Sequence, residues 1–392
     1  DDDNDLDGAY LATLRGSLRS PVGVAVGADG QVLVTDPFYG HIARFDSAGN
    51  TLTPWSISGG ALGVAWHPDG RRVFLTLRDE PKVAIYIRDE QTDTVAFSAY
   101  LGDGAVTFQR PTDLEIVAAS GVTYVVDSGG DRIYRFGDDG ALLAQFGERG
   151  IGSGQFRWPC GIAVDAANGL VFVADQDNYR IQVFDLAGKF QRSFGSRLQR
   201  TGSDLFAWMP RTQGLAVGSD SRLFVTDSLM GTVSVFDPAG QELGTISNYG
   251  FDPGDLRTPG DLAFSTDGAR LYVVNTGGSS VEVFAAPVDL PTPPTSTTPG
   301  GAALADGVPG VGQGPHFSNG PSSCKRCHQL TGQPGVNSGT VEGQGAICMS
   351  CHNAGGRGLG SSIHQQDVAN PYGTNPVVPA GRGRSHAWGV PA

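Results

Sequence analysis

The sequence has few basic side chains and no long apolar stretch. Among 392 residues, 27 are Lys or Arg and 40 are Asp or Glu, which gives a formal net charge of −13. A nucleic-acid-binding protein needs a basic patch, and the sequence shows none, so we expect no nucleic-acid partner. No apolar run reaches the length of about 18 residues that a transmembrane helix needs, so we expect no membrane span.

Cysteine and methionine are also scarce, and the cysteines are unevenly placed. The chain has 5 Cys and 3 Met, and every Cys except Cys160 lies after residue 315. Residues 1–315 hold 22 basic and 38 acidic side chains, a net of −16, whereas residues 316–392 hold 5 and 2, a net of +3. The chain therefore joins two chemically different modules.

A repeated unit fills the first module. In each unit an Asp or Asn ends one predicted strand, and a Phe lies in the next predicted strand. Successive Asp or Asn positions are 91, 48, 52 and 48 residues apart, and the Phe positions have the same spacing. The step of 91 hides a further unit at residues 62–87, which makes six. Units of about 40–50 residues with four short strands predict the blades of a β-propeller. The repeated positions are Asp36, Asp127, Asp175, Asp227 and Asn275, followed by Phe45, Phe136, Phe184, Phe236 and Phe284.

The two ends of this module predict how the ring closes. The sixth unit runs into prolines after residues 280–287 and lacks a fourth strand, while residues 10–16 precede the first unit without a partner. We predict that residues 10–16 form the outer strand of the last blade, which covers an exposed sheet edge. The predicted domains are an acidic tail at 1–8, an all-β propeller at 9–287, a Pro/Thr/Gly-rich linker at 288–315 and a second domain at 316–392.

Three segments carry a family resemblance. GSGQFRWPCGIAVD, VFVADQDNYRIQVFD and FGERGIGSGQF resemble NHL repeats, most strongly over residues 101–195. The resemblance implies a six-bladed propeller that acts as a binding disc and sometimes as an enzyme, without fixing a ligand. Lyase-type NHL propellers bind metal through several channel-facing His, a set that this sequence lacks. We interpret His41 as a strand-start residue, His67 as a surface-turn residue and Cys160 as a buried, inert thiol.

The second domain has too few apolar residues to build a core. Residues 316–392 hold only 12 Leu, Ile, Val, Phe and Met, so another group must hold this segment together. Two CxxCH motifs, the attachment motif of c-type haem, supply the candidates. In each motif the two thiols add to the haem vinyl groups and the His becomes the proximal iron ligand. The motifs are Cys324, Cys327 and His328, and then Cys348, Cys351 and His352.

We therefore predict a mostly irregular dihaem c-type cytochrome domain with two covalently bound haem c groups. A four-Cys zinc site and two disulfides are alternatives, and zinc would leave both trailing His unexplained. Met349 lies inside its own motif, and Met209 and Met230 belong to the propeller module. The candidates for the distal iron ligands are therefore His316, His364 and His386. This donor set predicts bis-His, low-potential haems without an open coordination position.

Iron without an open position passes electrons, so the sequence favours an electron carrier over an enzyme with its own substrate. The alternative is a haem-linked propeller dehydrogenase or its electron-transfer subunit, for which the sequence identifies no channel base. A third hypothesis is an adhesion or scaffolding protein in which the haems only stabilise the fold of the second domain. Because haem is attached to CxxCH outside the bacterial cytoplasm, we expect the protein in the periplasm, on the cell surface or outside the cell.

The segment HFSNGPSSCKRCH resembles doubled-CxxCH cytochromes, including subunits of extracellular cytochrome filaments. The expected partners are redox proteins or extracellular acceptors. Two irons need two distal ligands and three tail His remain, so one subunit can lend a His to its neighbour's haem. Repeated head to tail, this contact gives a filament with the propellers displayed outside. His316, at the end of the linker, is the preferred lent ligand, with His364 and His386 serving within the chain. A monomer with one unused His is the alternative.

The acidic tail matches the start of a calcium loop. Asp3, Asp5, Asp7 and Gly8 fit the D-x-D-x-D-G pattern. The residue in the twelfth position is Leu14, which cannot bind calcium. A solvated acidic tail and a calcium site completed by other groups both stay open.

Overall fold

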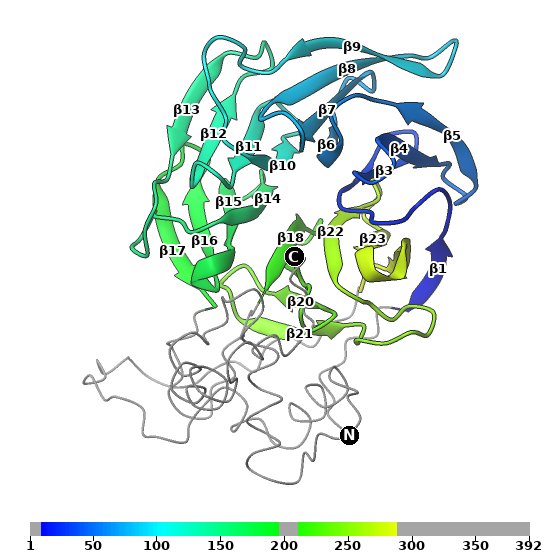
Figure 1. Ribbon diagram of the computed structural model, residues 1–392. Helices are drawn as coiled ribbons and strands as arrows, with labels where there is room; N and C mark the ends of the chain where they lie inside the picture. Colours follow the sequence, from blue (N-terminus) through cyan, green and yellow to red (C-terminus); the bar gives the residue numbers. More distant parts are fainter. Residues whose placement is uncertain (1–8, 196–210, 288–392) are drawn as a thin grey trace, which may run out of the picture. The chain divides into compact units, whose positions relative to one another are not determined.

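The computed structural model describes residues 9–195 and 211–287, which form a six-bladed β-propeller (Figure 1). Each blade is a four-stranded antiparallel sheet, so the predicted all-β fold and the hidden second blade are confirmed. Within the described ranges the only helical elements are the single turns η1 (Gln176–Asn178) and η2 (Thr276–Gly278). No described helix is long and apolar enough to cross a membrane. The predicted tail, linker and cytochrome domain lie outside the described residues.

The first three blades take their strands consecutively from the chain. Blade one contains β2 (Val24–Val26), β3 (Val32–Asp36), β4 (His41–Phe45) and β5 (Thr51–Ser56). Blade two contains β6 (Ala61–Trp66), β7 (Arg72–Leu77), β8 (Val83–Asp89) and β9 (Thr94–Tyr100). Blade three contains β10 (Pro111–Ile116), β11 (Thr123–Asp127), β12 (Arg132–Phe136) and β13 (Leu142–Phe146).

The remaining blades follow the same order until the last strand. Blade four contains β14 (Pro159–Asp165), β15 (Leu170–Asp175), β16 (Arg180–Asp185) and β17 (Phe190–Phe194). Blade five contains β18 (Thr212–Val217), β19 (Leu223–Asp227), β20 (Thr232–Phe236) and β21 (Glu242–Ile246). Blade six contains β22 (Pro259–Phe264), β23 (Arg270–Asn275), β24 (Ser280–Ala285) and, from the other end of the chain, β1 (Tyr10–Leu14).

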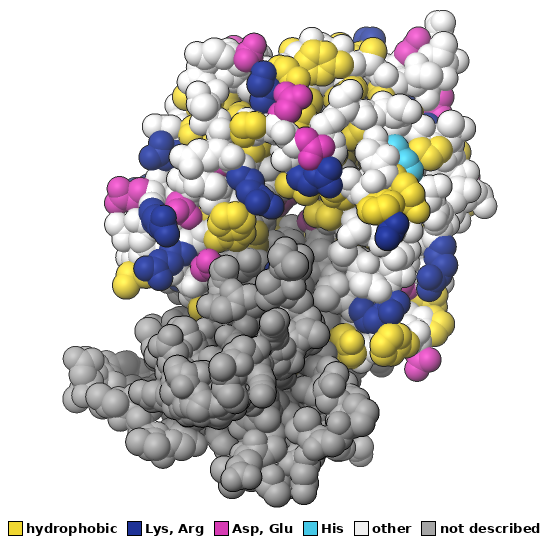
Figure 2. All heavy atoms as spheres, viewed as in Figure 1, with side chains coloured by type: hydrophobic (Ala, Val, Ile, Leu, Met, Phe, Trp, Pro, Cys, Tyr) yellow, Lys and Arg dark blue, Asp and Glu magenta, His cyan; other side chains and the backbone are white. Residues whose placement is uncertain are grey.

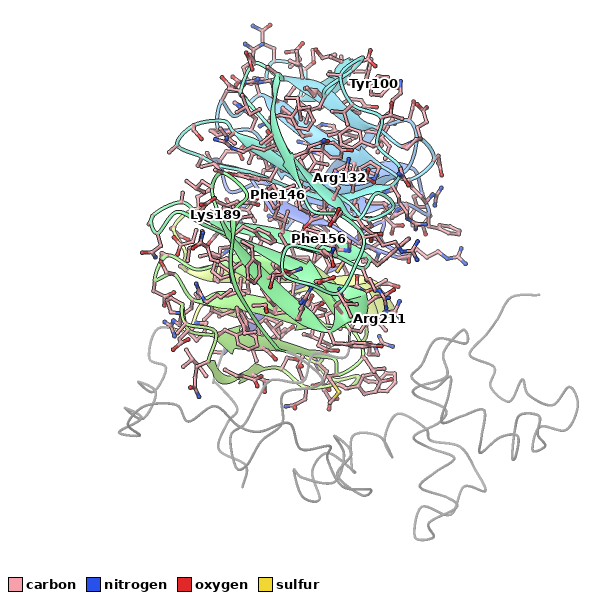
Figure 3. The ribbon with its side chains drawn as sticks, turned by 90° about the vertical axis from the view of Figure 1, so that its left-hand side faces the viewer. Tyr100, Arg132, Phe146, Phe156, Lys189 and Arg211 are labelled. Atoms are coloured by element: carbon pink, nitrogen blue, oxygen red, sulfur yellow. The ribbon has the colours of Figure 1, made fainter. Side chains whose placement is uncertain are left out.

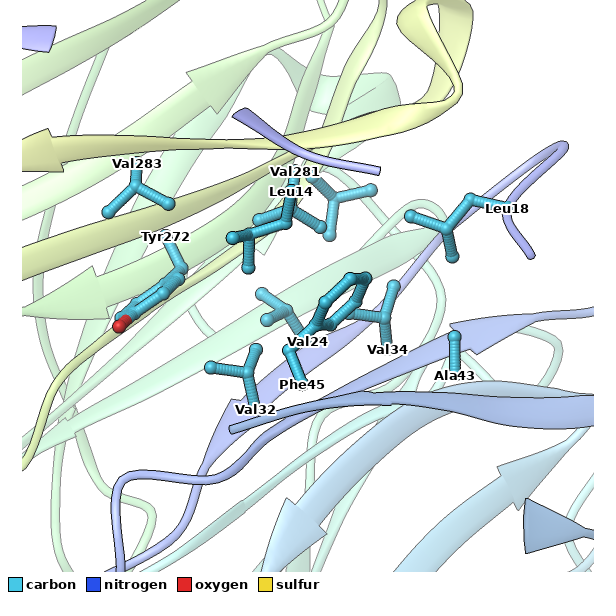
Figure 4. Packing of buried hydrophobic residues seen from close by; sticks show 11 residues of the cluster. Leu14, Leu18, Val24, Val32, Val34, Ala43, Phe45, Tyr272, Val281 and Val283 are labelled. Carbon is cyan, nitrogen blue, oxygen red and sulfur yellow. The ribbon is translucent and has the colours of Figure 1, made fainter. Parts of the chain in front are cut away.

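The ring closes as predicted, through β1. This strand pairs antiparallel with β24, with Tyr10 opposite Phe284 and Leu14 opposite Val281. The strand ends at Leu14 rather than at residue 16. The Leu14 side chain is 5% exposed and packs between the last and first blades in a cluster that Figure 4 shows. The first and last segments of the propeller are therefore held by both hydrogen bonds and apolar packing.

The repeated Phe side chains pack between neighbouring blades, and the repeated Asp side chains bind backbone N–H groups. Phe136 is fully buried in one apolar cluster with Phe74 of the preceding blade, and the other four repeated Phe lie in equivalent clusters between neighbouring blades. Asp127 is also fully buried, and its carboxylate accepts hydrogen bonds from the backbone N–H groups of Gln109 and Arg110 at 2.9 and 2.6 Å. These bonds tie a turn of each blade to the segment that enters its inner strand.

Candidate functional site in the propeller channel

The inner strands β2, β6, β10, β14, β18 and β22 contact one another in a ring around the channel. Four of the six blades repeat a Gly–aliphatic–Ala sequence there, as in Gly161-Ile162-Ala163. A Cβ on Gly161 would clash with the carbonyl oxygen of Gln213 in the next blade. The glycine is therefore required by the close approach of neighbouring inner strands.

A ring of hydrogen bonds joins every blade to the next near the channel. In each bond a side-chain hydroxyl or amide donates to a backbone carbonyl at the start of the following inner strand. The six bonds are Thr35 to Leu62, Thr76 to Thr112, Ser128 to Pro159, Gln176 to Thr212, Thr226 to Gly260 and Thr276 to Pro21. Hydrogen bonds therefore connect each blade to the next all the way around the channel.

Two blades on opposite sides of the ring depart from the Gly–aliphatic–Ala sequence. Asp113 in blade three and Asp261 in blade six occupy the Gly position. Each carboxylate accepts a hydrogen bond from the inner strand of the following blade: Asp113 from the Ile162 N–H at 2.9 Å, and Asp261 from the Val24 N–H at 3.1 Å. These two Asp therefore add two more links between blades.

Glu115 is the third departure, and it has no comparable link. It stands in blade three where the other five blades have Ala. Among the residues that the structure describes, none donates a hydrogen bond to its carboxyl. Burial raises the pKa of Glu115 to about 8, and the charge of Asp261 adds to the effect. Burial also raises the pKa of Asp261 to about 7, and that of Asp113 well above its usual value.

Three carboxyl groups therefore share the channel and disfavour one another's ionisation. A carboxyl with a pKa near 8 exchanges its proton close to neutral pH, which is the property of a general acid or base. Within residues 9–195 and 211–287, no group of three or more His, Cys, Asp and Glu is arranged to hold a metal ion. The chemistry that these three carboxyl groups offer is proton transfer or the binding of a cation.

The two propeller histidines lie away from this site. His41 begins β4 as predicted, and its ring stacks on Tyr39. His67 lies in the predicted turn, but the prediction of a surface position is wrong, because its side chain is only 6% exposed. Its Nδ1 lies 3.0 Å from Asp69 Oδ2 and its Nε2 lies 2.9 Å from Asp138 Oδ1 in the next blade. The ring is buried because it bridges two blades.

Cys160 is an unpaired thiol at the start of β14. It is half-buried rather than fully buried, and its Sγ lies 3.2 Å from the Thr212 carbonyl oxygen. Burial raises the pKa of this thiol, and the charges of Asp113 and Asp175 raise it further. Because the thiolate is the reactive form, the prediction of an inert thiol is supported.

The other residues that the sequence singles out lie outside the described residues. They are Asp3, Asp5, Asp7, Met209, His316, Cys324, Cys327, His328, Cys348, Met349, Cys351, His352, His364 and His386. The three channel carboxyls, by contrast, were not predicted from the sequence. Alignment of the inner strands would have identified them, because Asp113, Glu115 and Asp261 break a column of Gly or Ala.

Comparison with known proteins agrees with this architecture. The family model for the NHL repeat matches residues 156–184. A gluconolactonase from Xanthomonas campestris is similar in structure with a TM-score of 0.52 at 17% identity, over 70% of this chain and 89% of that one. A protein of unknown function from Bacteroides thetaiotaomicron has a TM-score of 0.56 at 16% identity, over 71% of each chain. No curated protein sequence matches the chain.

A virginiamycin B lyase from Staphylococcus aureus is similar with a TM-score of 0.48 at 15% identity, over 71% of this chain and 88% of that one. At such low identity, the two likenesses with TM-scores above 0.5 show the fold and not an activity. The chain therefore contains an NHL repeat within a six-bladed β-propeller.

Proposed function

We propose that the protein transfers electrons outside the cytoplasm through two c-type haems attached to residues 316–392. The two CxxCH motifs carry this proposal, because each combines two thiols at the required spacing with a trailing His. Neither zinc nor disulfides would account for the trailing His328 and His352. The scarcity of apolar residues in this segment supports it as well, since haem supplies a large apolar surface.

The donor set of the chain fits two haems. Cys324 and Cys327 would hold one haem by thioether bonds, with His328 as its proximal ligand. Cys348, Cys351 and His352 would do the same for the other. His316, His364 and His386 are the candidates for the distal ligands, and two His on one iron leave no position for a substrate. Bound in this way, each haem supplies a one-electron redox centre.

Attachment to CxxCH takes place outside the bacterial cytoplasm, so the proposed location is the periplasm, the cell surface or the medium. The proposed partners are redox proteins or extracellular electron acceptors. Three distal candidates for two irons leave one His to spare. We propose that this His, by preference His316, binds the haem of a neighbouring subunit, which gives a head-to-tail assembly.

Covalent attachment is tested by denaturing the full-length protein. Two haem masses and the haemochrome absorption of thioether-linked haem should stay with the chain. Cys324→Ala with Cys327→Ala should remove one haem. Cys160→Ala is the matched control, because it removes a thiol outside the motifs and should keep both haems. Zinc in the purified chain, or loss of all colour on denaturation, contradicts the proposal.

The lent ligand is tested by single replacements of the three distal candidates. His316→Ala should shift native material from assemblies to monomers, whereas His364→Ala and His386→Ala should change the haem spectrum of the monomer. Sedimentation velocity and the absorption spectrum together separate these outcomes. A monomeric wild type with two bis-His haems excludes the assembly and leaves the electron-transfer function intact.

Glu115 favours a second candidate, a haem-linked propeller dehydrogenase. Such an enzyme needs a base in the channel, and a carboxyl with a pKa near 8 meets that need. Substrate-dependent haem reduction that is lost in Glu115→Gln would support the enzyme. Haem reduction by small reductants at equal rates in wild type and Glu115→Gln, with no substrate found to reduce it, supports the carrier.

A further inference from the structure

Five blades place an arginine at the entrance to their inner strand. In each case the backbone N–H of the arginine donates to the repeated Asp or Asn of the same blade, for example from Arg157 to Asp175 at 2.7 Å and from Arg257 to Asn275 at 2.8 Å. The repeat that builds the blades thus also positions these arginines. They are Arg19, Arg110, Arg157, Arg211 and Arg257.

These five arginines differ from several other arginines of the propeller, which form ion pairs with carboxylates. Arg44 and Arg88 bind Asp93, and Arg180 binds Asp175. Among the described residues, by contrast, no carboxylate forms an ion pair with any of the five guanidinium groups. Four of the five side chains are exposed, and Arg257 is half-buried. Their donor groups are therefore available to a ligand.

Exposed aromatic rings hold three of these guanidinium groups. Arg19 lies 3.7 Å from the ring centroid of Phe38, Arg257 lies 4.7 Å from that of Phe251, and Arg110 lies 5.2 Å from that of Trp158. The three rings are 53%, 76% and 38% exposed, in that order. A guanidinium stacked on a ring keeps its N–H edge free and oriented, which suits a bidentate bond to a carboxylate.

The five arginines and three rings lie at one end of the propeller, and together we call them the arginine face. They all belong to segments that enter inner strands or to loops beside those segments. Figure 3 shows Arg211 at one end of the propeller and Lys189 at the other. Figure 2 shows Lys and Arg side chains beside hydrophobic ones on the face turned to the viewer, with some Asp and Glu among them. An arginine at the entrance to the inner strand recurs in five blades around the ring.

Charge complementarity indicates the occupant. Residues 1–8 carry five Asp, against five unpaired arginines on the face. This segment enters β1 at Tyr10, which pairs with Phe284 near the end of β24. The start of β24 lies beside the arginine face, because Ser279 Oγ donates to the Arg19 carbonyl oxygen at 2.8 Å. The acidic segment therefore joins the propeller away from the face, about 13 Å along the strand.

We propose that the arginine face binds an acidic peptide segment, and that its occupant is residues 1–8 of a second copy of the chain. A segment that leaves near one end of the propeller meets the opposite end of the next molecule without reversing its direction. The contact is heterologous and repeats from copy to copy. It deepens the assembly part of the proposed function, but it needs no haem ligand from a neighbour.

The first experiment compares two double variants of the full-length, haem-loaded protein by sedimentation velocity. Arg19→Gln with Arg257→Gln removes two charges from the face, and should weaken self-association about 10-fold, as expected for the loss of two exposed ion pairs. Arg71→Gln with Lys189→Gln removes two exposed charges from β-turns away from the face. This matched control should associate like the wild type. Circular dichroism checks that both variants are folded.

The second experiment reverses the charges. A chain with Lys in place of Asp1, Asp2, Asp3, Asp5 and Asp7 should not bind the wild-type face, but should bind a chain that carries Arg19→Glu and Arg257→Glu. Association of the wild type should weaken as salt rises, because the contacts are exposed. Restored association in the mixture supports the proposal, since a merely structural role of the arginines would not restore it.

Three results would overturn the proposal: a wild type that does not self-associate, equal association in the face and control variants, or failure of the mixed chains to associate. A synthetic DDDNDLDG peptide should bind the full-length protein and compete with association. A single-stranded oligonucleotide that binds more tightly than this peptide would show that the face recognises another polyanion. Haem content and haem spectra are recorded for every variant. They distinguish a failure of the arginine-face proposal from a failure of the proposed electron transfer.

Discussion

At the residue scale, the three channel carboxyls differ in what they do for the stability of the fold. Glu115 occupies a position that is Ala in the other five blades, and it receives no hydrogen bond from any described residue. Glu115 is half-buried, and a carboxyl that is partly removed from water without a hydrogen-bond partner destabilises a fold when it ionises. Asp113 and Asp261 differ from it, because their bonds to Ile162 and Val24 stabilise the blade contacts. Glu115 is therefore the channel residue whose presence packing does not explain.

Replacement of Glu115 by Ala should stabilise the propeller above neutral pH. The pKa of about 8 in the folded state lies above the ordinary value for Glu, about 4.3, so the folded protein holds the proton more tightly. The wild type should therefore lose stability between about pH 4.5 and 8, with a slope of up to ~1.4 kcal/mol per pH unit from this group. Glu115→Ala and Glu115→Gln should both lack this part of the slope. Urea unfolding at pH 5 and pH 8 measures it, and parallel pH profiles for wild type and variants would refute the burial of this carboxyl.

The thiol of Cys160 should resist alkylation. Its pKa is raised by burial and by nearby carboxylates, so very little thiolate is present at pH 8. Iodoacetamide at that pH should leave Cys160 unmodified in the native protein and modify it after denaturation. Peptide mass analysis reads both states. Rapid labelling of the native protein would contradict the environment described for this thiol.

At the scale of the elements, the closure strand decides whether the ring holds together. β1 supplies the fourth strand of blade six, and Leu14 inserts between that blade and the first (Figure 4). The other blades draw all four strands from one stretch of chain and need no such closure. Blade six thus depends on a contact between the two ends of the propeller, which is the most non-local pairing in the fold.

Two leucines of β1 provide a matched test of this closure. Leu14 is 5% exposed and Leu11 is 50% exposed. Leu14→Ala should lower the free energy of unfolding by about 2–4 kcal/mol, because it leaves a cavity between two blades. Leu11→Ala should change it by less than about 1 kcal/mol. Chemical denaturation measures both, and equal effects would mean that β1 is not held by the Leu14 side chain.

At the scale of the whole molecule, the propeller contains everything that its own closure requires. Both partners of the closing pair, β1 and β24, lie within residues 9–287. The strand pair that closes the ring therefore includes no residue of the linker or of the haem-motif segment.

A chain of residues 9–287 should fold and unfold like the propeller of the full-length protein. A chain of residues 15–287 lacks β1 and should melt at a markedly lower temperature, since an open sheet edge and an open core replace the closure. Calorimetry compares the two with the full-length protein. Loss of the propeller transition on removing residues 288–392 alone would show that the second module stabilises the ring.

The sequence by itself determined what is local or periodic. The spacing of Asp175, Phe184 and their repeats predicted six blades, and the missing fourth strand predicted closure by β1. The spacing within CxxCH likewise predicts haem attachment, since the chemistry needs only neighbouring residues. These features could be read because each depends on positions within one unit of the chain.

Only the tertiary structure decided what arises between units. Asp113 and Asp261 lie in opposite blades and influence each other because the ring brings their strands around one channel. His67 is buried because Asp138 of the next blade covers it. The arginines of the arginine face stand one or two blades apart in the sequence, so they form no basic run, and ring closure gathers them at one end. Burial, pKa and charge density depend on distances between blades, and a repeat pattern does not contain those distances.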